Sequence, residues 1–126
     1  MAKNGNHKQA FKNALAGLWL SFKTERNLRL MGIISVLVLL LSFFLKVSLI
    51  EFTIIVWAIF AVLAVEMINT SLEAITDLVR EEWHHQAKLA KDVAAGMVLL
   101  AVLGSVVVGS LIFIPKILNL VFSISA

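Results

Sequence analysis

Residues 52–77 read FTIIVWAIFAVLAVEMINTSLEAITD, and in this stretch fourteen uncharged, mostly apolar residues run directly into a polar segment. Five polar side chains in the second half recur at helical spacing, namely Glu66, Asn69, Thr70, Glu73 and Asp77. At 3.6 residues per turn, these five fall within about 100° of one another around a helix. The stretch therefore predicts a helix that crosses a membrane as an apolar segment and ends in a polar face, which we call the acidic stripe.

The composition of the whole chain supports a membrane setting. Of its 126 residues, 60% are hydrophobic, compared with roughly 45–50% in soluble domains. A spanning helix needs about 20 apolar residues, and three segments reach that length with their flanking residues. We expect one domain over residues 1–126, with transmembrane helices at 28–46, 49–79 and 90–114 and a C-terminal tail at 115–126. Cysteine is absent, which excludes disulfides and thiolate metal sites.

The N-terminal region predicts a helix of a different kind, over residues 7–27. Apolar residues recur there mostly at spacings of three and four, at Phe11, Leu15, Leu18, Trp19 and Phe22. A helix with such an apolar face and basic residues on its other faces can lie in the plane of the lipid headgroups. The predicted fold class is an all-α membrane protein with three transmembrane helices and an N-terminal amphipathic surface helix.

The basic residues predict an orientation. Nine of the eleven Lys and Arg residues lie within residues 1–29 and 80–91, and loops rich in Lys and Arg stay in the cytoplasm. We therefore expect the N-terminus and a loop at about 80–88 to be cytoplasmic.

The depth of the acidic stripe in the membrane determines which partners its carboxylates need. If the helix enters the bilayer near Leu49, Glu66 lies about 25 Å along it, just inside the far edge of a hydrocarbon core about 30 Å thick. Carboxylates at that depth need a polar cavity or a positive partner: a divalent cation, a lysine or a proton. Mg²⁺ prefers one or two carboxylates together with phosphates and water. Because Arg80, Lys88 and Lys91 would suit phosphate oxygens, the pattern favours phosphoryl transfer to a membrane alcohol.

Structural interpretations stay open for several of these residues. Glu66 could be an interhelical hydrogen-bonding group, and Asn69 could only pack between helices. Asp77 could be a solvated helix-end residue paired with Lys88 or Arg80.

Other function classes must also be weighed. A small ion-conducting oligomer would place its acidic residues near mid-membrane, whereas these cluster toward one interface beside a basic loop. A non-catalytic membrane adaptor stays open. The phosphate-binding loops G-x-x-x-x-G-K-[ST] and G-x-G-x-x-G are absent, so metal and basic side chains would have to hold any nucleotide. Nucleic-acid binding is unsupported because the basic residues follow topology.

Several motifs, taken together in order, resemble one known family. VEMINTSLEAITDLV is followed by EEWHHQAKLAKDVAAGMVLL, and F-K-N-A-x-x-G and E-R-N-x-R occur near the N-terminus. Over roughly residues 9–112, this set is similar to the prokaryotic diacylglycerol kinase and undecaprenol kinase family. The resemblance implies a small integral-membrane lipid kinase of the bacterial plasma membrane. It also implies a homotrimer that uses ATP and Mg²⁺.

The resemblance also implies roles for individual positions. Glu66 matches the catalytic base and a substrate contact, and Glu25 and Glu73 match metal ligands that also contact the nucleotide. The remaining implied positions are Glu82, Trp83, His84, Lys91 and Asp92 at the nucleotide, Asn69 and Asp77 as supporting motif positions, and Arg29 and Ala95 at the acceptor. Asp92 either positions Lys91 or caps the third helix near its N-terminus.

The resemblance also bears on which lipid is the acceptor. The segment AKDVAAG, at residues 90–96, looks more like Gram-positive members, which resemble undecaprenol kinases, than like Gram-negative diacylglycerol kinases. We therefore expect undecaprenol as the acceptor, with diacylglycerol as the alternative.

Overall fold

The computed structural model describes residues 7–79 and 84–125. Within these ranges the regular elements are all helices: α1 (His7–Thr24), α2 (Arg26–Phe44), α3 (Leu49–Thr76) and α4 (His85–Ser125). By length and composition, α2, α3 and α4 can each cross a membrane. The predicted all-α class with three spanning helices is confirmed.

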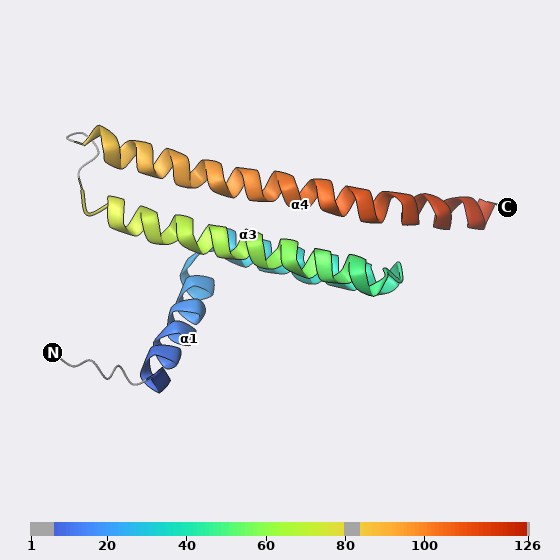
Figure 1. The fold of residues 1–126 in the computed structure, drawn as a ribbon, viewed down its shortest axis with the longest axis horizontal. Coiled ribbons are helices and arrows are strands. Elements are labelled where there is room, and N and C mark those ends of the chain that lie inside the picture. Colours follow the sequence, from blue (N-terminus) through green and yellow to red (C-terminus); the bar gives the residue numbers. More distant parts are fainter. Residues whose placement is uncertain (1–6, 80–83, 126) are drawn as a thin grey trace.

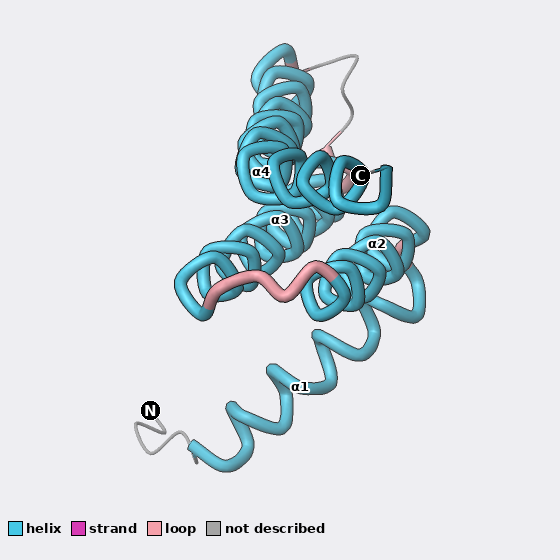
Figure 2. The backbone as a smooth tube through the Cα atoms, turned by 90° about the vertical axis from the view of Figure 1, so that its right-hand side faces the viewer, coloured by secondary structure: helices cyan, strands magenta, loops and turns pink. Residues whose placement is uncertain are grey.

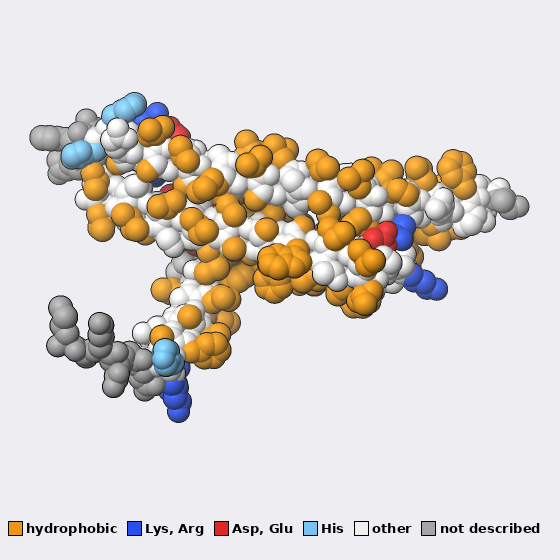
Figure 3. All heavy atoms as spheres, in the orientation of Figure 1, with side chains coloured by type: hydrophobic (Ala, Val, Ile, Leu, Met, Phe, Trp, Pro, Cys, Tyr) orange, Lys and Arg blue, Asp and Glu red, His pale blue; other side chains and the backbone are white. Residues whose placement is uncertain are grey.

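Helix α3 is the centre of the arrangement. It packs antiparallel along α4 and against α2, and α1 contacts α2 (Figure 1). Figure 2 shows α2 and α4 on different sides of α3, with α1 leaving the bundle at a steep angle. Apolar side chains cover much of the face shown in Figure 3, and large apolar residues are exposed along all three long helices. Such a surface suits lipid tails or further copies of the chain, because water would not solvate it favourably.

The joint between α1 and α2 is built by three residues. Glu25 has extended backbone angles (φ −88°, ψ 116°), which end one helix and begin the next. The Arg29 guanidinium donates to the carbonyls of Lys23 at 2.5 Å and Phe22 at 3.5 Å, which satisfies acceptors at the end of α1. The Phe22 ring lies so close to Gly32 that a Cβ there would be 3.1 Å from it. These contacts set the angle at which α1 leaves the bundle.

The turn between α2 and α3 is closed by a capping box. The Glu51 amide donates to Ser48 Oγ at 3.2 Å, and the Ser48 amide donates to Glu51 Oε2 at 2.6 Å. Lys116 Nζ from α4 also pairs with Glu51 Oε2 at 3.0 Å. One carboxylate thus joins the start of α3 to the far part of α4.

We expect Ser48→Ala to destabilise the protein by about 1 kcal/mol, the usual value of an N-cap side chain. The measurement is the thermal unfolding midpoint of the purified protein in detergent. Ser71→Ala is the matched control, since the Ser71 hydroxyl bonds the Met67 carbonyl within α3 and caps no helix end. Equal midpoints for the two variants would contradict a capping role.

Several helix boundaries differ from the sequence predictions. Helix α3 ends at Thr76, with Asp77 as its C-cap, whereas the prediction extended it to residue 79. Helix α4 starts at His85 and continues through Pro115 to Ser125, where the sequence predicted a loop to 88 and a tail from 115. A proline removes only one helical hydrogen bond, and membrane helices tolerate that loss. At 41 residues, α4 is about 60 Å long, roughly twice the hydrocarbon thickness.

Candidate active site

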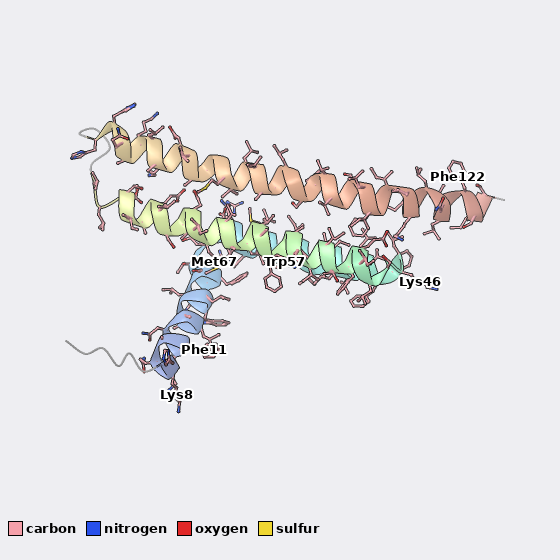
Figure 4. The ribbon with its side chains drawn as sticks, in the orientation of Figure 1. Lys8, Phe11, Lys46, Trp57, Met67 and Phe122 are labelled. Atoms are coloured by element: carbon pink, nitrogen blue, oxygen red, sulfur yellow. The ribbon has the colours of Figure 1, made fainter. Side chains whose placement is uncertain are left out.

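Glu66 is the centre of the candidate site. It lies on α3 and is only 4% exposed. Its carboxylate interacts with the Asn27 side chain from the first turn of α2, and the negative charges of Glu73 and Glu25 act on it. Figure 4 labels the adjacent residue Met67, beside the place where α1 meets the bundle. The structure therefore gathers carboxylates from the α1–α2 joint and from the acidic stripe.

Asn69 links this cluster to Glu73. Its Nδ2 donates to Glu73 Oε1 at 3.1 Å, and the residue is 9% exposed. Its Oδ1 is buried and has no hydrogen-bond partner among the described residues. A buried acceptor left alone costs about 1–3 kcal/mol, so this oxygen suits a ligand that brings a donor or a cation.

Glu25 adds a further carboxylate near Glu66. It occupies the N-cap position of α2, yet its side chain makes no capping hydrogen bond. Its half-buried position beside Glu66 leaves the carboxylate available to a ligand.

These oxygens fit a magnesium ion that is shared with phosphates. Within residues 7–79 and 84–125, no three His, Asp or Glu side chains come close enough to hold a metal by themselves. Mg²⁺ does not require such a cage, because it keeps waters and binds one or two carboxylates plus substrate phosphates. Glu25, Glu73 and the unpartnered Asn69 oxygen are hard oxygen donors of the kind it prefers.

Lys91 connects α4 to the last residue of the acidic stripe. Its Nζ lies 2.9 Å from Asp77 Oδ1 at the end of α3. Asp92 pairs instead with Lys88 at 3.5 Å, with both side chains largely exposed. Asp92 lies beyond the first turn of α4, so the alternative that it caps the helix is wrong, while the alternative that it positions Lys91 stays a prediction. Asp92 is the eighth residue of α4 and lies one turn from Lys88 on the same face of the helix.

The other predicted positions are dispersed. His84 is exposed just before α4, and Ala95 is exposed one turn beyond Lys91. Arg29 donates to the end of α1, as described above. Glu82 and Trp83 lie outside the described residues.

An apolar groove of about 550 Å³ lies among α2, α3 and α4. Val62 and Met31 are among its lining residues, and they lie one helical turn from Glu66 and Asn27 respectively. The groove therefore reaches to within one helical turn of the buried carboxylate.

The sequence profile described as prokaryotic diacylglycerol kinase matches residues 12–113. The chain belongs to this family. It is therefore a membrane kinase with an alcohol acceptor, and kinase relatives imply a nucleotide as phosphoryl donor.

Individual members of the family carry two kinds of name. An undecaprenol kinase from Bacillus subtilis is 37% identical over 108 residues, which are 86% of this chain and 88% of that protein. A diacylglycerol kinase from Synechocystis sp. is also 37% identical, over 88% of this chain but 64% of its own length. A diacylglycerol kinase from Escherichia coli is 28% identical over 72% of this chain and 75% of its own.

Asn27 belongs to the candidate site, and the sequence did not single it out. It is the third residue of the E-R-N-x-R motif, two positions after Glu25. The motif marked position 27 as part of the family pattern, but only the packing of α2 on α3 shows that the Asn27 side chain interacts with Glu66.

Proposed function

We propose that the protein transfers the γ-phosphoryl group of ATP, with Mg²⁺, to the terminal hydroxyl of undecaprenol. One observation carries the proposal: a buried carboxylate, Glu66, lies among other carboxylates and one turn from an apolar groove. A lipid alcohol needs both features, since its hydroxyl must reach a base while its chain stays out of water.

Glu66 acts on the acceptor. It takes the hydroxyl proton as the acceptor oxygen attacks the γ-phosphorus, a general-base role that typically contributes 10²–10⁴-fold. The new oxygen–phosphorus bond forms as the bond to the β-phosphate oxygen breaks, so the products are the lipid phosphate and ADP. Asn27 orients the carboxylate from α2, and the apolar groove receives the chain adjoining the hydroxyl.

The donor is held by the other site residues. Glu25 and Glu73 would hold Mg²⁺ with the Asn69 oxygen beside them, and the bound ion would neutralise phosphate charge. Lys91, held by Asp77, stabilises negative charge on the transferred group. We assign Glu82, Trp83, His84 and Asp92 to the nucleotide and Arg29 and Ala95 to the acceptor, as the family motifs imply.

Undecaprenol is favoured over diacylglycerol on two grounds. The AKDVAAG segment resembles the Gram-positive type, and the undecaprenol kinase relative matches over most of both chains. Diacylglycerol kinase activity is the alternative, because a relative with that name is equally identical.

The deciding assay uses purified protein, Mg²⁺ and γ-labelled ATP, with undecaprenol and diacylglycerol offered in parallel. We expect labelled undecaprenyl phosphate to form faster than labelled phosphatidic acid. Faster labelling of diacylglycerol would select the alternative acceptor. Labelling of neither lipid would overturn the kinase proposal and favour an ion-conducting oligomer or an adaptor.

The proposed assembly is a homotrimer in the bacterial plasma membrane, with a cytoplasmic N-terminus. The exposed apolar surface of the spanning helices supports association, because membrane helices associate by packing such surfaces. The basic residues near the N-terminus support the orientation. Native mass measurement should give three chains of 13.9 kDa.

A further inference from the structure

A second polar region lies at the end of the bundle away from Glu66. A cavity of about 410 Å³ opens between the α2–α3 turn and the last part of α4. Four polar residues line it, namely Lys46, Lys116, Asn119 and Ser123. Figure 4 labels Lys46 at this turn, well away from Met67 at the carboxylate cluster. The proposed reaction uses none of these residues.

The continuation of α4 beyond Pro115 creates this cavity. Lys116, Asn119 and Ser123 follow one another at spacings of three and four, so they share one face of the helix. That face is turned toward the α2–α3 turn, because all three line the same cavity. A chain that left the helix at Pro115 would not present Asn119 and Ser123 there.

The charges in this region leave a positive excess. Lys116 pairs with Glu51 at 3.0 Å, and Lys46 adds a second positive charge at the turn. The negative end of α2 and the positive end of α3 meet at the same turn and offset each other. Two lysines and one glutamate therefore leave a net charge of about +1.

The cavity also has an apolar wall. Phe44, Leu45 and Leu120 line it together with the polar residues. It lies beside the turn where α2 ends and α3 begins, which is one end of both candidate membrane spans. A ligand that is anionic at one end and apolar at the other would match this composition.

We propose that this cavity binds the phosphate headgroup of an anionic glycerophospholipid. Lys46, Lys116 and Asn119 supply donors for phosphate and glycerol oxygens, and the apolar wall contacts the first part of an acyl chain. This site is separate from the acceptor site and does not depend on the proposed reaction.

The test is titration of the full chain in detergent with phosphatidylglycerol, followed by native mass spectrometry. We expect Lys46→Gln to weaken binding about fivefold, the factor for one lysine near an anionic headgroup. The matched control is Lys12→Gln on α1, which removes the same charge elsewhere and should change binding less than twofold. Equal losses in the two variants, or none in Lys46→Gln, would overturn the proposal.

Two further arms make the result specific. Asn119→Ala keeps both lysines and should also weaken phosphatidylglycerol binding. This variant provides the test if Lys46→Gln does not fold. Phosphatidylcholine, which has no net charge, should bind more weakly than phosphatidylglycerol. Lys46-dependent binding of inorganic phosphate without lipid binding would identify free phosphate as the ligand and overturn the lipid assignment.

Discussion

Glu66→Gln is expected to lower kcat for lipid phosphorylation by about 10²–10⁴-fold, the contribution of a positioned general base. The amide has nearly the same shape as the carboxylate but cannot take the acceptor proton at neutral pH. The measurement is the initial rate of label transfer from ATP at saturating lipid. Because Glu66 is not assigned to the metal, the Mg²⁺ concentration for half-maximal rate should stay near the wild-type value.

Ser71→Ala is the control for Glu66→Gln, because it alters an exposed side chain of the same helix whose hydroxyl bonds only a carbonyl one turn away. Its rate should equal that of the wild type. Membrane insertion and oligomeric mass of both variants should match the wild type. Near-wild-type turnover by Glu66→Gln would remove the general-base role.

Glu73→Gln and Glu25→Gln are each expected to raise the Mg²⁺ requirement by at least about 10–100-fold, since even indirect partners of a metal site have effects of that size. The loss should be much less than additive in the double variant, because both residues act on one ion. The rate should be measured as a function of Mg²⁺ concentration. Mn²⁺ binding in the presence of a non-hydrolysable ATP analogue supplies a readout independent of turnover.

The contrast between these variants is the decisive part. Glu66→Gln should lose rate without losing metal affinity, whereas Glu25→Gln and Glu73→Gln should lose metal affinity first and recover rate at high Mg²⁺. An unchanged Mg²⁺ dependence in Glu25→Gln would mean that the α1–α2 joint holds no metal ligand. Glu73 would then be the carboxylate that carries the metal role.

The acidic stripe is a feature that helical periodicity alone predicts. The spacing from Glu66 to Asp77 predicts one helical face, and the contact between Asn69 and Glu73 on α3 agrees with it. Residues three or four apart on a helix are neighbours whatever the rest of the fold does. The shared helical face of Asn69 and Glu73 was therefore predictable from the sequence.

Helical spacing does not predict contacts between different helices. Lys91 pairs with Asp77, although the sequence offered Lys88 or Arg80 as partners for Asp77 and Asp92 as a partner for Lys91. Which face of α4 meets α3 depends on how the two helices pack. No local spacing encodes that choice.

By itself, the sequence determined the three apolar spans, the all-α class and the polar face at the end of α3, because hydrophobic length and helical period are local properties. Only the tertiary structure decided that Glu25 and Asn27 meet Glu66, and that α4 continues past Pro115 to line a cavity at the opposite end. The physical reason is that residues about 40 positions apart meet only when helices pack at one particular angle and register, and that geometry is set by all their contacts together.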